Sequence, residues 1–545
     1  MRSLKARIVG WTLACMSALQ HGCAGSAPVA RGFVQHERHD VAVVGNGELV
    51  ARVACDDAGT VRVELDHVDS FDEQGVRRAL GTLRISGDPP LVRAGDSPRL
   101  WLEHGVVEVR ADGEGRDAVR VFVDPEAPAM HVLLEGRTPR VLRVEVEPPP
   151  ARSGEPPVSE DVVIDAEAEP DAVAWYHRNG GSIQPAWLAE RGLAAHATLF
   201  DDPFILRTAG ARVEGDGFVR VGPRALATDG AVRRAELRAT ASCVQADGLD
   251  GWLERLTKMA ALVACSDEAE ARTRAWWRAR GERAFVECAQ DADAARLADE
   301  RARWLAQAGG RFAAARGFAE FESMAAMGDA DRIGPLLAQH ARVLRVREAR
   351  TRLEGGTGAC VVDPISPASL EGSEACALGS LPRFIELALD HLEGTGDAAM
   401  WRSCSLPVIE AAIEHLEWRI DAGAVRAKEV EGLRDALERL CALDESLADT
   451  AGRARWSRLL AASAGAPAAP ARGAAILARL LRAEGGRLIV LPDWPRERDV
   501  RFRLHAAGAW GDAEVRGGRL VRLEVEPAAR RGDVAVGPGW ELPAG

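Results

Sequence analysis

The chain contains very little asparagine, tyrosine or lysine. Asparagine occurs only at Asn46 and Asn179, Tyr176 is the single tyrosine, and nearly all of the positive charge is arginine. That arginine is spread along the 545 residues without a basic cluster, and the net charge is −13. Because nucleic-acid phosphates are bound by basic surfaces, this composition excludes a nucleic-acid partner and leaves sugars and other small polar molecules open.

Motifs for metals and nucleotides are missing as well. The ten cysteines are scattered singly, without a C-x-x-C pair or a cysteine–histidine ligand spacing, so we expect no metal site. There is no P-loop, dinucleotide fingerprint or Ser-His-Asp arrangement, and we expect no cofactor. The cysteines could pair or remain buried free thiols, and the sequence does not distinguish these alternatives.

No stretch of the sequence is apolar over the length that a transmembrane helix needs. The N-terminus instead has the pattern of a signal peptide, which we place at residues 1–27. Basic residues precede the short apolar run 8–19, and small residues at 25–27 offer a cleavage site. The pattern predicts an exported protein, periplasmic or extracellular. Lipoprotein anchoring through Cys23 is a second interpretation, although the residues before it fit poorly.

Residues 28–247 have the pattern of a β-sandwich. From Val119 to Val123 apolar and other side chains alternate with a period of two, which is typical of a half-buried strand. Similar short strands are expected at 61–65, 106–109 and 141–146, with glycine or aspartate turns between them. Short strands at this spacing predict an antiparallel sandwich.

Helical patterns follow the β-region. Residues 248–285 are expected to form connecting helices, since apolar residues from Trp252 to Val263 recur at helical spacing. Residues 286–483 lack strand patterns, and a Gly-Asp pair is twice followed by a proline that suits the start of a helix. This internal repeat predicts helical hairpins that pack one after another along the chain. In residues 484–545 apolar and charged side chains alternate again. This pattern predicts a small β-domain with a hairpin at Gly517-Gly518.

Five sequence blocks occur in the order found in a known family. They are GNGEL (45–49), LGTLRI (80–85), WYHRN (175–179), DPFILRTAG (202–210) and the C-terminal segment 485–536. In these blocks the chain resembles the six-hairpin glycosidase-like proteins, especially the bacterial branch whose N-terminal region is domain of unknown function 5703. It is more distantly similar to the family 95 glycoside hydrolases, which are fucosidases. The resemblance implies an N-terminal β-sandwich, a central helical-hairpin domain related to an (α/α)6 toroid, and a small C-terminal β-domain.

The chain departs from this family in the helical domain. It is shorter, so the resemblance implies a truncated toroid. The family's asparagine-containing and aromatic blocks have no counterpart between residues 300 and 316, and GAPAAPARG (465–473) stands in place of an acidic segment. Family 95 enzymes use a glutamate as general acid and an aspartate-oriented asparagine as base. Because no asparagine follows Asn179, that base is missing from the helical domain.

Glycoside hydrolysis by inversion needs two carboxyl groups, one as acid and one as base. The candidate catalytic residues are Asp363, where the family pattern has an acidic residue, and Glu386, which shares a helix face with Asp390. Under the alternative interpretation, Glu386 and Asp390 are an exposed i, i+4 pair and Asp363 caps a loop.

The candidate substrate-binding residues are Trp175, His177, Arg178 and Asn179. The indole of Trp175 could stack on a sugar ring, and its polar neighbours could bind the hydroxyl groups. The alternative, which we favour, is a structural role in which a buried aromatic residue has polar neighbours that satisfy backbone groups at an interdomain contact.

The sequence as a whole predicts an exported, carbohydrate-associated protein of glycoside hydrolase ancestry with an eroded active site and a glycan as ligand. One alternative is an active glycoside hydrolase that uses a rearranged carboxylate pair in the helical domain. Another is a drifted protein whose toroid no longer closes. The sequence fixes neither the sugar nor the oligomeric state.

Overall fold

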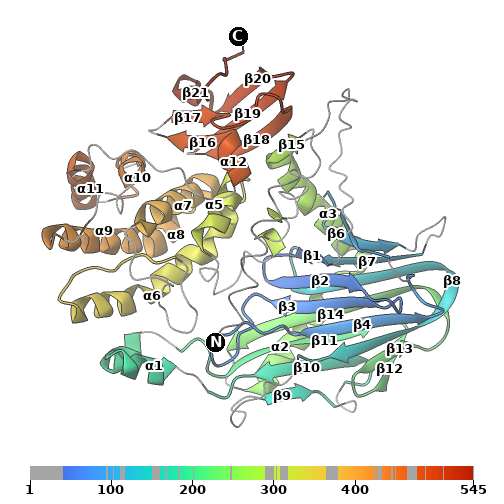
Figure 1. Cartoon of the computed structure of the whole chain (residues 1–545). Coiled ribbons are helices and arrows are strands. Elements are labelled where there is room, and N and C mark those ends of the chain that lie inside the picture. The colour runs from blue at the N-terminus through green and yellow to red at the C-terminus, as the bar shows by residue number, and fades with distance from the viewer. Residues whose placement is uncertain are drawn as a thin grey trace, which may run out of the picture. The chain divides into compact units, whose positions relative to one another are not determined.

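The computed structural model of the chain describes residues 41–543 with internal gaps (Figure 1). The gaps are residues 94–95, 102, 111–116, 150–159, 166–168, 182–183, 200–201, 246–247, 289–299, 302–303, 307–316, 364–378, 424, 426–432, 444–445, 449, 463–474, 485–486 and 507. The predicted signal peptide 1–27, with Cys23, lies outside the described residues, as does the whole of segment 465–473. In the described part of the chain, no helix is long and apolar enough to cross a membrane.

The N-terminal region is a large antiparallel β-structure, as predicted. Its strands are β1 (Ala42–Gly45), β2 (Leu49–Cys55), β3 (Val61–His67), β4 (Gly81–Asp88), β5 (Arg99–Trp101), β6 (Val106–Arg110), β7 (Ala118–Val123), β8 (Ala129–Glu147), β9 (Glu160–Val163), β10 (Ala172–Arg178), β11 (Arg207–Gly215), β12 (Phe218–Gly222), β13 (Ala225–Thr228) and β14 (Val232–Gln245). The main path runs β1-β2-β3-β4-β8-β14-β11-β10-β9, and β5, β6 and β7 join it through β8.

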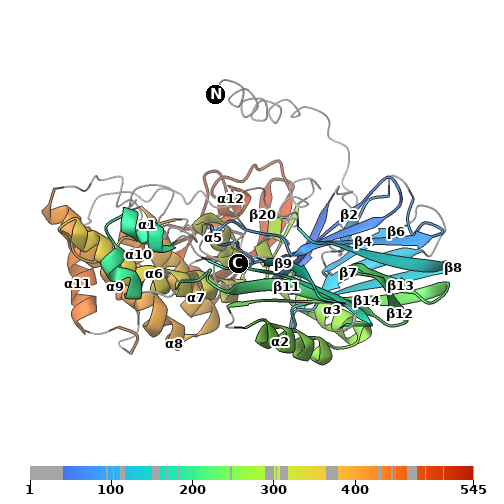
Figure 2. The same cartoon turned by 90° about the horizontal axis from the view of Figure 1, so that it is seen from below.

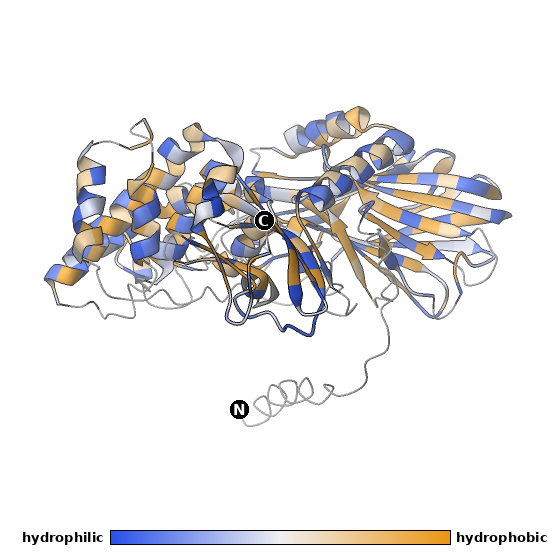
Figure 3. Ribbon diagram, turned by 90° about the horizontal axis from the view of Figure 1, so that it is seen from above, coloured by the Kyte–Doolittle hydropathy of each residue, from blue (hydrophilic) through white to orange (hydrophobic). Residues whose placement is uncertain are grey.

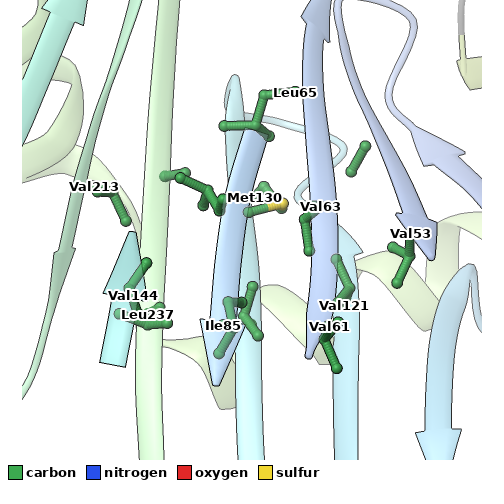
Figure 4. Packing of buried hydrophobic residues seen from close by; sticks show 14 of the residues in the cluster. Val53, Val61, Val63, Leu65, Ile85, Val121, Met130, Val144, Val213 and Leu237 are labelled. Carbon is green, nitrogen blue, oxygen red and sulfur yellow. The ribbon is translucent and has the colours of Figure 1, made fainter. Parts of the chain in front are cut away.

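The long strand β8 connects two parts of this structure. Its second half pairs with β4, and its first half pairs with β7 and β14. Side chains from β2, β3 and β4 pack against side chains from β7, β8, β11 and β14, as Figure 4 shows for Val63, Ile85, Val121 and Met130. All four are fully buried. The alternation of apolar and polar residues along these strands is visible in Figure 3 and explains why one face is core.

Two helices, α2 (Leu249–Leu262) and α3 (Ser266–Arg283), follow the β-region. Figure 2 shows α2 and α3 along one side of it. Trp252 and Leu256 of α2 are buried against Tyr176 of β10. Trp277 of α3 joins the β-core.

Gly105, in the turn between β5 and β6, lies directly against Trp277. It has φ +61°, and a β-carbon added there would lie 1.9 Å from the indole Cδ1. We expect Gly105→Ala to lower the free energy of unfolding by about 3 kcal/mol, since left-handed strain adds to overpacking. Gly217→Ala is the control, because Gly217 has φ +75° but nothing within 4 Å. Equal losses for both variants in urea titrations would contradict the tight contact with Trp277.

The helical region packs around one large apolar core. Its helices are α1 (Gln184–Glu190), inserted between β10 and β11, and α5 (Phe318–Ala326), α6 (Gly334–Leu353), α7 (Ser380–Thr395), α8 (Ala398–Met400), α9 (Leu406–Asp421), α10 (Leu433–Cys441), α11 (Thr450–Ala462) and α12 (Ala475–Leu480). The helical character predicted for this region is confirmed. The relation to a truncated (α/α)6 toroid stays a prediction.

The C-terminal region forms two small sheets with their own core. Its strands are β15 (Phe285–Cys288), β16 (Leu481–Glu484), β17 (Arg487–Val490), β18 (Val500–Ala506), β19 (Ala509–Arg516), β20 (Arg519–Glu526) and β21 (Val534–Val536). The predicted hairpin is confirmed: Gly517 and Gly518 join β19 to β20, with φ of +53° and +74°. Strands β15 and β16 come from the edges of the helical segment, where the sequence predicts no strand.

Candidate functional site

Three carboxylates share the polar face of α7. Glu386, Asp390 and Glu393 recur at i, i+4 and i+7, and the opposite face of the helix is buried in the helical core. Arg439 of α10 contacts all three. Its Nη1 pairs with Glu386, and its Nη2 lies 3.0 Å from Asp390 Oδ1 and 2.9 Å from Glu393 Oε2. We call these four residues the α7 cluster.

The α7 cluster is partly withdrawn from water. The side chains of Asp390 and Arg439 are each 17% exposed, and that of Glu386 is 32% exposed. The structure therefore does not place Glu386 and Asp390 as a freely solvated pair. A guanidinium from another helix holds them.

Negative charge exceeds positive charge within the cluster, since one guanidinium faces three carboxylates. Burial, and then the charges of Glu393 and Glu322, raise the pKa of Asp390 well above its usual range. Burial raises the pKa of Glu393 to about 7, against the opposing charge of Arg530. Burial thus favours the protonated form of both carboxyl groups.

Two basic groups, His505 and Arg439, lie in these surroundings, and burial lowers the pKa of both. Burial, with the charge of Arg439 as the next cause, lowers the pKa of His505 on β18 to about 4, so this imidazole is neutral at pH 7. Burial and the charge of Arg530 lower the pKa of Arg439 to about 10, which leaves its guanidinium charged at pH 7.

Asp363 lies at the N-terminus of α5. Its Oδ1 accepts a hydrogen bond from the backbone N–H of Phe318 at 2.7 Å, and its Oδ2 lies 3.3 Å from Arg383 Nη1. Arg383 Nε donates to Glu322 Oε1 at 2.5 Å. Burial raises the pKa of Asp363, while the Phe318 hydrogen bond and Arg383 oppose that rise. Asp363 thus caps a helix rather than a loop, and an arginine contacts its second oxygen.

The two predicted catalytic residues are related through α7: Glu386 lies on this helix, and Asp363 contacts another of its residues. Arg383, which binds Asp363, precedes Glu386 by three residues on α7. A step of three residues back from Glu386 and forward from Asp390, which keeps to the same helix face, would have found Arg383 and Glu393. Nothing local to α7 indicates Arg439, because it comes from a different helix.

The WYHRN block forms β10, between β9 and β11. Trp175 is 2% exposed, and its Nε1 donates to the carbonyl oxygen of Leu80 at 2.7 Å. Arg178 Nη1 donates to Thr208 Oγ1 on β11 at 2.9 Å. The indole ring therefore packs within the β-core.

Asn179 and His177 form a buried hydrogen-bonded pair at the end of β10. His177 Nε2 lies 2.9 Å from Asn179 Oδ1, and its Nδ1 lies 2.9 Å from Asp161 Oδ1. Asn179 Nδ2 donates to the carbonyl oxygens of Phe71 and Phe204 at 3.0 and 3.1 Å. All these contacts lie within the β-region. A role for the four block residues in glycan binding stays a prediction.

The structure contains a paired cysteine and several free ones, and the free ones are partly or fully exposed. Cys360 is disulfide-bonded. Free thiols are found at Cys55, Cys243, Cys265, Cys404 and Cys441. Within the described ranges, no group of three or more His, Cys, Asp or Glu side chains is placed to hold a metal ion.

Comparison with known families identifies the N-terminal half. Residues 36–286 match DUF5703_N, a domain of unknown function (DUF5703). The resemblance to this domain is thus confirmed over that segment, which covers the β-region, α2 and α3. No curated protein matches the chain.

Solved structures offer remote similarities. One is a candidate kojibiose phosphorylase from the human microbiome, at 9% identity and a TM-score of 0.49, with 76% of this chain and 66% of that chain covered. Two are family GH92 mannosidases from Bacteroides thetaiotaomicron, each at 10% identity. For the inverting mannosidase the TM-score is 0.36, and the match covers 78% of this chain and 61% of that chain. For the alpha-mannosidase the TM-score is 0.34, and the match covers 78% of this chain and 62% of that chain. The chain spans slightly less than two thirds of each of these three chains.

Proposed function

We propose that this is an exported, carbohydrate-associated protein of glycoside hydrolase ancestry whose helical-domain carboxylates no longer form a working acid–base pair. The observation that carries the proposal is the contact of Arg439 with Glu386, Asp390 and Glu393. A glycosidase needs one carboxyl group that gives a proton to the leaving oxygen. A guanidinium in contact with a carboxylate occupies its oxygen atoms, and its charge acts against the rise in pKa that burial causes, so Arg439 opposes that role.

The same argument applies to Asp363. One of its oxygens accepts the Phe318 N–H and the other faces Arg383. Each oxygen is thus held by a protein group, and the side chain is only 13% exposed. The association with carbohydrate is supported by the resemblance of the sequence blocks to glycosidase-like proteins, and the DUF5703_N match supports the family resemblance over residues 36–286. Export is supported by the N-terminal sequence pattern.

An active glycoside hydrolase is the second candidate, and one observation favours it. The pKa of Asp390 is raised well above its usual range, and that of Glu393 is raised to about 7. A carboxyl group that stays protonated at neutral pH is what a general acid requires. For this function, substrate binding would have to displace Arg439 from one of its partners.

Product release from fucosylated, galactosylated and plant polysaccharides distinguishes the two functions. The proposal predicts no released oligosaccharide from the folded protein. Products that vanish in Asp390→Asn and Glu386→Gln but persist in Glu438→Gln would overturn it and establish a hydrolase. Glu438 is the control because it lies on α10, is 38% exposed and pairs only locally with Arg434 at 2.9 Å.

A further inference from the structure

A groove of about 450 Å³ lies on the outer side of the β-region, across β5, β6, β7 and β8, with Arg274 of α3 at its side. The groove has a polar lining because apolar and polar side chains alternate along β6 and point to opposite faces of the sheet. Val107 and Val109 of β6 are fully buried in the β-core, so Glu108 and Arg110 lie on the opposite face. The volume lies within the range of about 300–1,000 Å³ that is usual for small-molecule sites. We call it the outer groove.

An aromatic side chain forms one end of the outer groove. Trp101, the last residue of β5, donates from Nε1 to Glu108 Oε2 at 2.9 Å. Glu108 is in turn held by Arg110 Nε at 2.8 Å. The ring of His104 is stacked near the indole, at 6.5 Å between centroids and 23° between planes. The orientation of the indole is thus fixed before any ligand binds.

The polar wall of the groove is also fixed in place. Arg120 Nη1 donates to both carboxylate oxygens of Glu270 at 3.0 and 3.1 Å, and its Nη2 lies 3.3 Å from Glu135. Asp117 accepts from Arg140 Nη2 at 2.5 Å. Glu135 is 41% exposed, so it is open to hydrogen bonds from solvent or ligand.

The charges that line the groove cancel. Three carboxylates and three guanidiniums line it, namely Glu108, Asp117, Glu135, Arg110, Arg120 and Arg274. The groove is therefore neutral although the whole chain carries a charge of −13. Such a site offers many fixed donors and acceptors but no net field that would attract an ion. An uncharged ligand with adjacent hydroxyl groups and an apolar ring face has the matching chemistry.

We propose that the outer groove is a binding site for a neutral oligosaccharide. The indole of Trp101 lies against the face of one sugar ring, and the carboxylates and guanidiniums bond its hydroxyl groups. The site goes beyond the proposed function, because it involves none of the helical-domain carboxylates. It holds whether or not those carboxylates catalyse a reaction.

The test is a titration of the full chain with neutral hexasaccharides of glucose, xylose, mannose and galactose, with oligogalacturonate as the charged comparison. We expect binding of at least one neutral hexasaccharide and weaker binding of the charged one. Trp101→Ala should weaken binding about tenfold, from the loss of an aromatic contact. Trp101→Phe should retain most of the affinity, since it keeps an aromatic face.

Glu135→Gln should weaken binding severalfold, and Glu145→Gln is its matched control. Both lie on β8, with 41% and 45% exposure, and both pair with an arginine, but Glu145 is outside the groove. Binding that is unchanged in Trp101→Ala and Glu135→Gln, or no binding of any neutral hexasaccharide, would overturn the proposal. Binding that persists in Asp390→Asn would support it, and loss in that variant would place the ligand in the α7 cluster instead.

Discussion

Arg439→Met is expected to destabilise the protein by about 3–5 kcal/mol at neutral pH, because removal of one partner from a buried ion pair leaves charges uncompensated. Arg439 is 17% exposed and is the guanidinium shared by Glu386, Asp390 and Glu393. Methionine keeps much of the apolar volume of the side chain. The lost free energy of unfolding therefore reflects the removal of the charge and not the creation of a cavity. Urea unfolding at constant pH measures it.

The loss should grow as the pH rises. The pKa of Glu393 is raised from its ordinary value of 4.5 to about 7 in the folded protein. Between these values the folded state binds more protons than the unfolded state, so stability falls with increasing pH. Without Arg439 the carboxylates raise one another's pKa further. The variant should therefore be close to wild type near pH 4.5 and furthest from it near pH 8.

Arg434→Met provides the matched control for this experiment. Arg434 is on the same helix and pairs with Glu438, but the two side chains are 47% and 38% exposed. An exposed pair of this kind contributes less than about 1 kcal/mol. If Arg439→Met behaves like Arg434→Met, with no added dependence on pH, then the α7 cluster is a solvated surface, and the interpretation of Glu386 and Asp390 as an exposed i, i+4 pair is restored.

Local patterns predict much of the fold. The alternation from Val119 to Val123 falls within β7, and Gly517-Gly518 is the turn of a hairpin. These features depend on neighbours in sequence. The pairing of β16 with β17 is also local, since Glu484 pairs with Arg487. Strand β15 is different, because it pairs with β18, and Val500 lies 212 residues beyond its partner Cys288. Such long-range pairing leaves little trace in a segment dominated by helix-forming residues.

In the candidate site, too, contacts between neighbours in sequence were predictable, whereas contacts between different helices were not. Helical spacing places Glu386 and Asp390 on one face of α7, and the structure has them there. Their partner Arg439 lies 49 residues beyond Asp390, so their burial and pKa depend on how α10 packs. Asp363 likewise gains its role from α5 and from Arg383, neither of which is adjacent in sequence.

Asn179→Asp should also be strongly destabilising, by about 3 kcal/mol or more, since it buries a charge and sets one carboxylate oxygen against two carbonyl oxygens. The wild-type amide is fully buried and donates to the carbonyl oxygens of Phe71 and Phe204. The introduced carboxylate would face both oxygens, while the side-chain volume stays the same. Urea unfolding should show the largest loss above pH 6 and a smaller one at pH 4, where the introduced group is protonated more readily.

Gln245→Glu is the control for Asn179→Asp, because it makes the same change from amide to carboxylate at an exposed position. Gln245 is exposed, and its Nε2 also donates to two backbone carbonyls, those of Asp202 and Ile205, at 2.7 and 3.0 Å. Water can replace these contacts, so the loss should stay below about 1 kcal/mol. A small loss in both variants would mean that the end of β10 admits water. Asn179 and His177 would then be open to a ligand, and their predicted role in glycan binding would gain over the structural one.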